Sequence, residues 1–213
     1  MVSCSFACTL AFMYLVPQEL QRGLGMSSTL AGLLMLPGGI VNAVCTLMAG
    51  RLFDRHGARV LVWIGVVMAA IGGALFFAIG VDSGVVLFLA AHIIVMVGIP
   101  FIQQSAQSAA LKSLPGRMAA DGSTILNTMQ QVCGAIATAV ATCLLGLGQT
   151  GYAAGGGANA AQGFVDGSRY GYMFGLVLVA IVLVFSFMLK GGKEEPKLVP
   201  VQVDDGAVES LAV

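Results

Sequence analysis

Two long apolar segments are separated by one short polar stretch, Gly50-Arg51-Leu52-Phe53-Asp54-Arg55-His56-Gly57-Ala58-Arg59. Residues 27–49 before it and residues 60–80 after it contain no charged side chain. Each segment is long enough to cross a hydrocarbon core of about 30 Å at about 1.5 Å per residue. Glycine at positions 50 and 57 allows a sharp return of the backbone. The stretch is therefore predicted to be a tight loop between two transmembrane helices.

The composition places the chain in a membrane. Of its 213 residues, 58% are hydrophobic and 9% are charged, and the mean hydropathy is +0.93. So few charges cannot cover a soluble globule of this size. Ten basic and ten acidic residues balance, so no nucleic-acid partner is expected. The sequence contains no recognisable nucleophile, phosphate-loop or metal-ligand motif, so we expect no enzyme activity, no metal site and no cofactor.

The fold prediction is an all-α polytopic membrane protein with six transmembrane helices in one bundle. The six uncharged runs are residues 1–16, 27–49, 60–80, 85–111, 123–147 and 170–189. The first is interpreted as a truncated span, because Pro17 is expected to end it short of the ~20 residues that a span needs. Gly/Ala-rich residues 148–169 are predicted to form a flexible loop. The bundle is expected to occupy residues 1–189, and residues 190–213 a disordered cytoplasmic tail.

The basic residues predict the orientation in the membrane. The loops after the second and fourth spans, together with the tail, hold eight of the ten, namely Arg51, Arg55, Arg59, Lys112, Arg117, Lys190, Lys193 and Lys197. The opposite loops hold only Arg22 and Arg169. Because Lys and Arg are retained on the cytoplasmic side, both termini are predicted to be cytoplasmic.

Polar side chains follow one face of the fourth and fifth spans. They are candidates for lining a substrate cavity: His92, Gln103, Gln107, Asn127 and Gln131. Intramembrane polar residues usually face the bundle interior or a water-filled cavity. Helix-to-helix contact and cavity lining both remain open, as do a neutral and a proton-carrying His92. The six predicted spans contain no acidic residue, so no proton-coupling carboxylate is expected in this chain.

The polar stretch resembles the signature loop of the major facilitator superfamily, G-x-L-x-D-R-x-G-R-K. The matching positions are Gly50, Leu52, Asp54, Arg55, Gly57 and Arg59, whereas Ala58 departs from the pattern. Residues 122–139 are similar to the matching span of fourteen-span drug:proton antiporters in this superfamily, with Gln130 where many relatives have arginine. The resemblance implies the C-terminal half of a secondary transporter, a proton-coupled multidrug efflux permease. Such a half is not competent without the missing N-terminal half of six or eight spans.

The resemblance also implies a gating loop and a set of partners. The gating residues would be Gly50, Asp54, Arg55, Gly57 and Arg59. Asp54 is predicted to accept from backbone N–H groups of the next helix and to pair with an arginine, although the three arginines also satisfy positive-inside sorting alone. The implied partners are the lipid of a bacterial cell membrane, protons, a small amphipathic drug-like substrate, and the missing half or a second copy. The alternatives are a self-sufficient six-span homodimeric transporter and a non-transporting scaffold or remnant.

Overall fold

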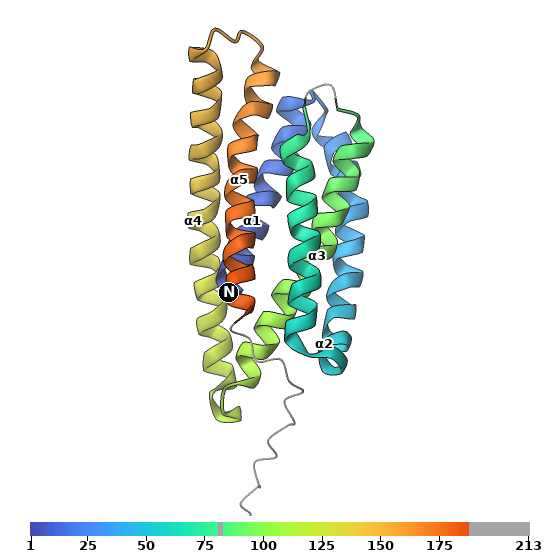
Figure 1. Ribbon diagram of the computed structural model, residues 1–213, viewed down its shortest axis with the longest axis vertical. Coiled ribbons are helices and arrows are strands. Elements are labelled where there is room, and N and C mark those ends of the chain that lie inside the picture. The colour runs from blue at the N-terminus through green and yellow to red at the C-terminus, as the bar shows by residue number, and fades with distance from the viewer. Residues whose placement is uncertain (81–82, 188–213) are drawn as a thin grey trace, which may run out of the picture.

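The computed structural model describes residues 1–80 and 83–187, and this part of the chain is helical without strands (Figure 1). The elements in order are α1 (Val2–Gln18), the π-helical segment η1 (Glu19–Gly23), α2 (Ser28–Ala78), α3 (Val85–Lys112), the short 3₁₀ helix η2 (Gly116–Met118), α4 (Ala119–Ala154) and α5 (Ala160–Ser186). The tail expected at residues 190–213 lies outside the described residues.

Four helical segments of the described chain are long and apolar enough to cross a membrane. They are α2, α3, the continuous segment of η2 and α4, and α5. The helix α1, with 17 residues, falls short of that length on its own. This confirms, for the described residues, the prediction of an all-helical chain with helices long and apolar enough to cross a membrane.

The 51 residues of α2 form two arms that reverse direction at Gly57. Gly57 has φ 76° and ψ 166°, which is not helical, whereas the helix is regular on both sides of it. Only glycine adopts this backbone region readily, because a Cβ would clash there. Figure 1 shows the two arms of α2 side by side, joined at the lower end of the molecule. We call residues 28–56 the first arm and residues 58–78 the second arm.

The expectation that the first helix ends at Pro17 is wrong. Pro17 lies inside α1, and the helical path continues through η1 to Gly23. A proline removes one backbone N–H, and a wide π turn follows it. Burial of Leu15, Val16 and Leu20 on the inner face offsets the loss. This helical path also buries Glu19.

The expectation of a flexible loop at residues 148–169 is also wrong. Helix α4 continues to Ala154, and α5 begins at Ala160, where the side chain of Asn159 accepts from the first backbone N–H groups. A Cβ at Gly148 would lie 2.5 Å from the Cα of Gly167. The small residues therefore permit close contact between α4 and α5, which their composition alone does not distinguish from flexibility.

The core combines an aromatic cluster with backbone contacts between helices. Tyr172 of α5 stacks on Phe12 of α1 at 5.6 Å and on Phe76 of α2 at 4.9 Å between ring centroids. Phe88 of α3 contacts Phe76 edge-on at 5.1 Å. Four helices therefore meet at one buried group of rings, which we call the aromatic cluster (Phe12, Phe76, Phe88 and Tyr172).

Candidate functional site

The signature loop ends the first arm of α2 and begins the second. Gly57 makes the reversal, as predicted for this loop, but Gly50 does not take part. Gly50 is helical and exposed, and a Cβ added to it would meet no atom within 4 Å. The side chains of Arg51, Arg55 and Arg59 are exposed around the turn. At this polar end of α2, the two arms are therefore joined by a turn at a single glycine.

Asp54 of this loop pairs with Lys112, at the end of α3. The Lys112 Nζ donates to Asp54 Oδ1 at 3.0 Å, and the same ammonium lies 4.4 Å from the ring centroid of Phe53. The predicted partners of Asp54, an arginine and the backbone N–H groups of the next helix, are therefore replaced by a lysine within the described chain. The reason is topological, since α3 ends at the same level as the reversal of α2 (Figure 1). The two basic loops therefore share one end of the bundle.

The polar residues of α4 lie on an exposed flank of that helix. Asn127 and Gln131 are exposed, and neither side chain hydrogen-bonds within the described residues. Next to them, Gly134 lies on the packed face, where an added Cβ would meet Phe6 and Leu10 of α1. Opposite the packed face the exposed side chains are apolar, for example Met129. The helix thus presents separate packed, polar and apolar faces.

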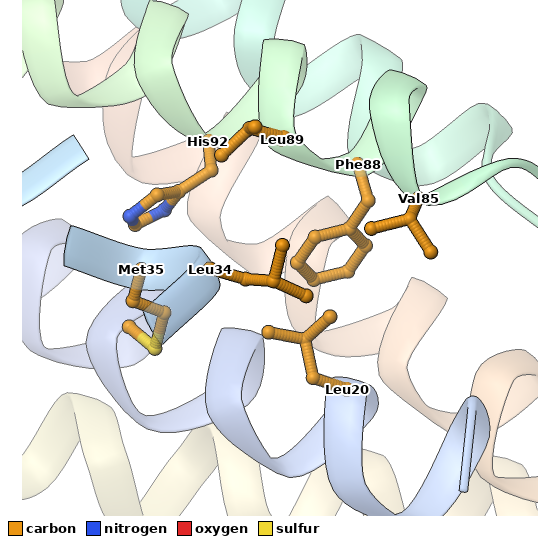
Figure 2. Close-up of a pocket in the computed structure, with 7 residues that line it drawn as sticks. All are labelled: Leu20, Leu34, Met35, Val85, Phe88, Leu89 and His92. Carbon is orange, nitrogen blue, oxygen red and sulfur yellow. The ribbon is translucent and has the colours of Figure 1, made fainter. Parts of the chain in front are cut away.

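On α3, the predicted site residues differ in depth. Gln103 and Gln107 are half-buried near the end of α3 that carries Lys112, whereas His92 is buried. Its ring contacts Gly38 so closely that a Cβ there would overlap it, and its Nδ1 has no hydrogen-bond partner in the described chain. Figure 2 shows His92 beside Met35 at an apolar hollow that has no room for a water molecule. In this arrangement His92 faces packed side chains and no open cavity.

The predicted substrate-cavity residues are carried by two helices, α3 and α4, that pack mainly on different neighbours. Helix α4 packs mainly on α1 and α5, while α3 packs mainly on α2. Helix α1 contacts both α3 and α4, and α3 also contacts α4 directly.

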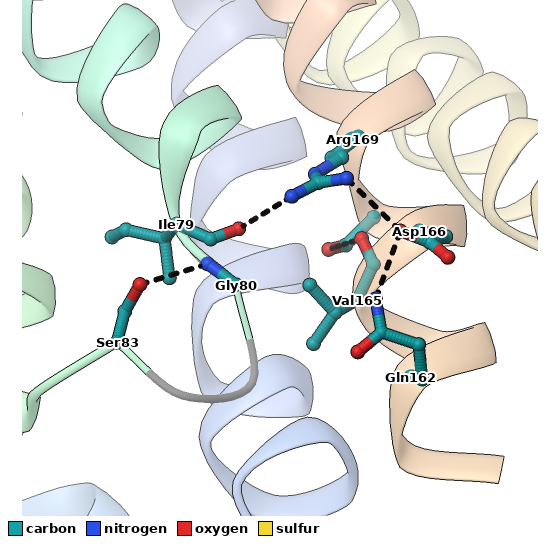
Figure 3. Close-up of polar contacts among 8 residues, drawn as sticks. Ile79, Gly80, Ser83, Gln162, Val165, Asp166 and Arg169 are labelled. Carbon is teal, nitrogen blue, oxygen red and sulfur yellow. Dashed lines mark hydrogen bonds and ion pairs between the residues drawn. The ribbon is translucent and has the colours of Figure 1, made fainter. Parts of the chain in front are cut away.

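A second polar group lies at the opposite end of the bundle, where α2 ends and α5 begins (Figure 3). Arg169 of α5 donates to Asp166 Oδ1 at 3.0 Å and to the backbone oxygen of Ile79 at 3.4 Å. Gln162 donates to the same oxygen of Asp166 at 3.3 Å. Arg169 therefore ties the end of the second arm of α2 to α5.

Glu19 is a polar residue that the sequence analysis missed. It is 1% exposed and accepts a hydrogen bond from the Tyr172 hydroxyl, which is itself fully buried. The absence of acidic residues from the spans was predicted only because Pro17 was expected to end the first helix. A signal was available: Phe12, Leu15, Glu19 and Gly23 recur at steps of three and four, which marks one helical face.

The sequence of residues 1–138 matches the Major Facilitator Superfamily. The chain belongs to this superfamily. It is 36% identical over 199 residues to the lincomycin resistance protein LmrB of Listeria monocytogenes, an alignment that covers 91% of this chain and 42% of that protein. It is 34% identical over 186 residues to LmrB of Bacillus subtilis, covering 85% of this chain and 39% of the relative.

A more distant relative of this major facilitator chain is the multidrug resistance protein B homolog of Mycobacterium tuberculosis. The two are 29% identical over 133 residues, which is 62% of this chain and 25% of the relative. The chain thus spans about two fifths of the length of the two LmrB relatives that it matches. All three of these relatives are bacterial.

Proposed function

We propose that this chain is the C-terminal half of a proton-coupled multidrug efflux transporter of a bacterial cell membrane. The observation that carries the proposal is the alignment to LmrB, which takes in 91% of this chain but only 42% of that resistance protein. Substrates of such transporters lie near the membrane midplane, between two halves that move against each other. One half supplies one wall of that site and needs a complementary half.

In this proposal the bundle has six spans. The helix α1 with η1 is the first, the two arms of α2 are the second and third, and α3, α4 and α5 are the others. The Asp54–Lys112 pair supports this topology because it requires the predicted second and fourth loops to share one side. Positive-inside sorting would place that side, and both termini, in the cytoplasm.

The substrate would contact the polar flank of α4 and the half-buried polar end of α3. Asn127 and Gln131 support this assignment, since exposed amides without partners would be unfavourable against lipid by about a kcal/mol or more each. Gln103 and Gln107 complete the proposed surface, and His92 would join it only if α3 moves away from the first arm of α2. The ligand expected there is a small amphipathic drug-like molecule.

The loop at residues 50–59 is proposed to bias the conformational cycle. Asp54 and Lys112 are 70% and 53% exposed, so the ion pair is weak enough to break and reform, at about 1 kcal/mol or less. Asp54→Asn should slow transport more than Arg51→Lys, because only the first removes the anion that Lys112 binds. Substrate binding to one state can survive this change while the rate of transport falls. Equal transport by wild type and Asp54→Asn would leave the loop with a topological role only.

Everted membrane vesicles provide the test of function. The chain is expressed alone and, separately, joined to the part of Listeria LmrB that it does not match. Lincomycin and a fluorescent cationic dye serve as substrates. Extrusion driven by the pH gradient is expected from the joined protein and not from the chain alone. Extrusion by the chain alone would favour the homodimeric transporter, and no extrusion by a stably inserted joined protein would contradict the proposal.

Single-cysteine labelling provides the test of the substrate surface, after the five native cysteines have been replaced. Positions 103, 107 and 131 of the joined protein are expected to react with a small water-soluble thiol reagent, and substrate should slow that reaction. Position 129 is the matched control on the apolar face of α4, because Met129 is 50% exposed. Inert positions 103, 107 and 131 would assign these amides to helix packing.

A further inference from the structure

Glu19 and Tyr172 form a buried polar pair between the end of the first helical path and α5. The carboxylate of Glu19 is 1% exposed, and the ring and hydroxyl of Tyr172 are fully buried. The Tyr172 hydroxyl donates to Glu19 Oε2, and Glu19 has no ion pair within the described residues. A neutral hydroxyl does not compensate a buried negative charge, whose desolvation costs several kcal/mol.

Apolar groups enclose this pair on the side of the bundle interior. The Tyr172 ring belongs to the aromatic cluster and stacks on Phe12 and Phe76. Gly23 lies one helical turn after Glu19. A Cβ added to Gly23 would lie 3.3 Å from Glu19 Cγ and 3.0 Å from the side chain of Val165. The pair is therefore enclosed by packed side chains in this arrangement.

A hollow lies beyond the next turn of η1. It has a volume of about 600 Å³ at the end of α4 and the start of α5, and Arg22 and Phe164 line part of it. Phe164 also borders Gly23, where an added Cβ would come within 3.9 Å of its ring. Movement of α5 away from η1 would open the contact of Phe164 with Gly23, which lies between Glu19 and this hollow.

The charged groups around Glu19 are few. From α5, Arg169 is the cation that acts electrostatically on Glu19, but its hydrogen bonds go to Asp166 and to the Ile79 backbone. On η1 itself, Arg22 is exposed. The titratable groups that face Glu19 from the described helices are thus Tyr172 and Arg169, with Asp166 held by the arginine.

The backbone at Glu19 is unusual as well. The first residue of the π-helical segment is Glu19, whose carbonyl accepts from the N–H of Leu24 at 3.0 Å. Single π turns inside helices are frequent at functional sites, because they are less stable than regular helix and can change register. Here the π turn presents Glu19 to Tyr172 and also offers a place where that contact can break.

We propose that Glu19, held by Tyr172, is a proton-binding site of this chain. In the packed arrangement the carboxyl group carries the proton and Tyr172 donates to its carbonyl oxygen. When α5 moves away from η1, the O–H bond of Glu19 breaks, water in the hollow accepts the proton, and the carboxylate becomes available to Arg169. If Arg169 turned from Asp166 to the Glu19 carboxylate, its hydrogen bond to the backbone oxygen of Ile79 would weaken. The contact between α5 and the end of α2 would then loosen. The role of this proton site in coupling rests on the proposed transport function.

Infrared spectroscopy of the full chain in lipid nanodiscs tests the proton site directly. The absorption of a protonated carboxyl group is expected at neutral pH, lost at alkaline pH and restored on return. Glu19→Gln, which keeps the size of the side chain, should remove this band. The matched control is the triple variant Glu194→Gln, Glu195→Gln and Glu209→Gln, which changes every other glutamate of the chain and should keep the band.

Two further samples keep the test decisive if Glu19→Gln does not fold. Carbon-13 glutamate in the triple variant labels Glu19 alone, so the band should shift with the isotope. Tyr172→Phe should move the band to higher frequency, because the carbonyl loses its hydrogen bond, without abolishing it. A band that survives Glu19→Gln, or no isotope-sensitive protonated band at neutral pH, would overturn the proposal.

The coupling role is tested in the joined protein described above. Glu19→Gln should reduce extrusion driven by the pH gradient to background, while exchange of dye across the membrane without a gradient persists. Wild-type extrusion by Glu19→Gln would refute coupling through Glu19. If the joined wild type does not transport while the infrared band is present, the proposed function fails and the proton site stands.

Discussion

The contact between the second arm of α2 and α3 depends on two facing glycines. A Cβ at Gly65 would lie 2.6 Å from the carbonyl oxygen of Gly98 and 3.0 Å from the backbone nitrogen of Ile102. A Cβ at Gly98 would in turn lie 2.6 Å from the carbonyl oxygen of Gly65. Backbone atoms cannot rotate away as flexible side chains do, so Gly65→Ala must push the two helices apart.

The expected size of the effect follows from two opposing contributions. Overpacking a close contact typically destabilises by about 1–3 kcal/mol. Alanine gains about 1 kcal/mol over glycine in a helix interior. Gly65→Ala should therefore lower the free energy of unfolding by about 0–2 kcal/mol. The matched control is Gly39→Ala in the first arm of α2, where an added Cβ meets no atom within 4 Å. That variant should be more stable than wild type by about 0.5–1 kcal/mol.

Unfolding by sodium dodecyl sulfate in mixed micelles is the assay. Trp63, the one tryptophan of the chain, lies in the same arm and contacts Phe187 edge-on at 5.0 Å, so its fluorescence reports separation of α2 from α5. A difference of about 2 kcal/mol between the variants corresponds to roughly a thirtyfold change in the unfolding equilibrium. If Gly65→Ala is as stable as Gly39→Ala, the close backbone contact does not exist in the membrane and the reasoning is refuted.

Three further predictions concern the loops. Gly57→Ala should destabilise by about 1–3 kcal/mol in the same assay, because the φ of 76° at Gly57 disfavours a residue with a Cβ. Gly50→Ala should not destabilise the protein. Equal free energies of unfolding for the two variants would contradict a reversal at one glycine. Lys112→Ala should lower the free energy of unfolding by at most about 1 kcal/mol, and by less at high salt, because the Asp54–Lys112 ion pair is exposed. A larger loss would show that this ion pair is buried in the native membrane. In a cysteine-free background, position 157 should be labelled from outside the cell and position 56 only after permeabilisation; external labelling at 56 would overturn the proposed orientation.

The parts of the fold that followed from the sequence are those set by local composition. Uncharged runs predicted long apolar helices, and the polar stretch at residues 50–59 predicted a reversal there, although not that Gly57 alone would make it. The two errors have one cause, which is that Pro17 and the Gly/Ala-rich residues 148–169 were interpreted by their local tendencies. Packing decided otherwise, since a buried helical face continues past Pro17 and close contact of α4 with α5 uses the glycines.

The candidate site was less predictable because it depends on which elements meet. Lys112 and Asp54 are 58 residues apart, and Tyr172 and Glu19 are 153 apart, so no spacing rule connects either pair. Helical periodicity did place Asn127 and Gln131 on one face. Whether that face meets water, lipid or a second half is not encoded in the helix itself. The assignment of these amides to substrate therefore stays a prediction.

The two ends of the bundle differ in how strongly their polar contacts resist motion. At the end that carries the signature loop, Asp54 and Lys112 are exposed, and water solvates both charges when they separate. At the other end, separation of Glu19 from Tyr172 brings a buried carboxyl group to water, and its free energy depends on whether the proton stays. In the proposed mechanism, a proton gradient acts on the second contact. Within the proposed transporter, the signature loop would therefore adjust the balance between conformations, while occupancy of Glu19 would give that balance its dependence on pH.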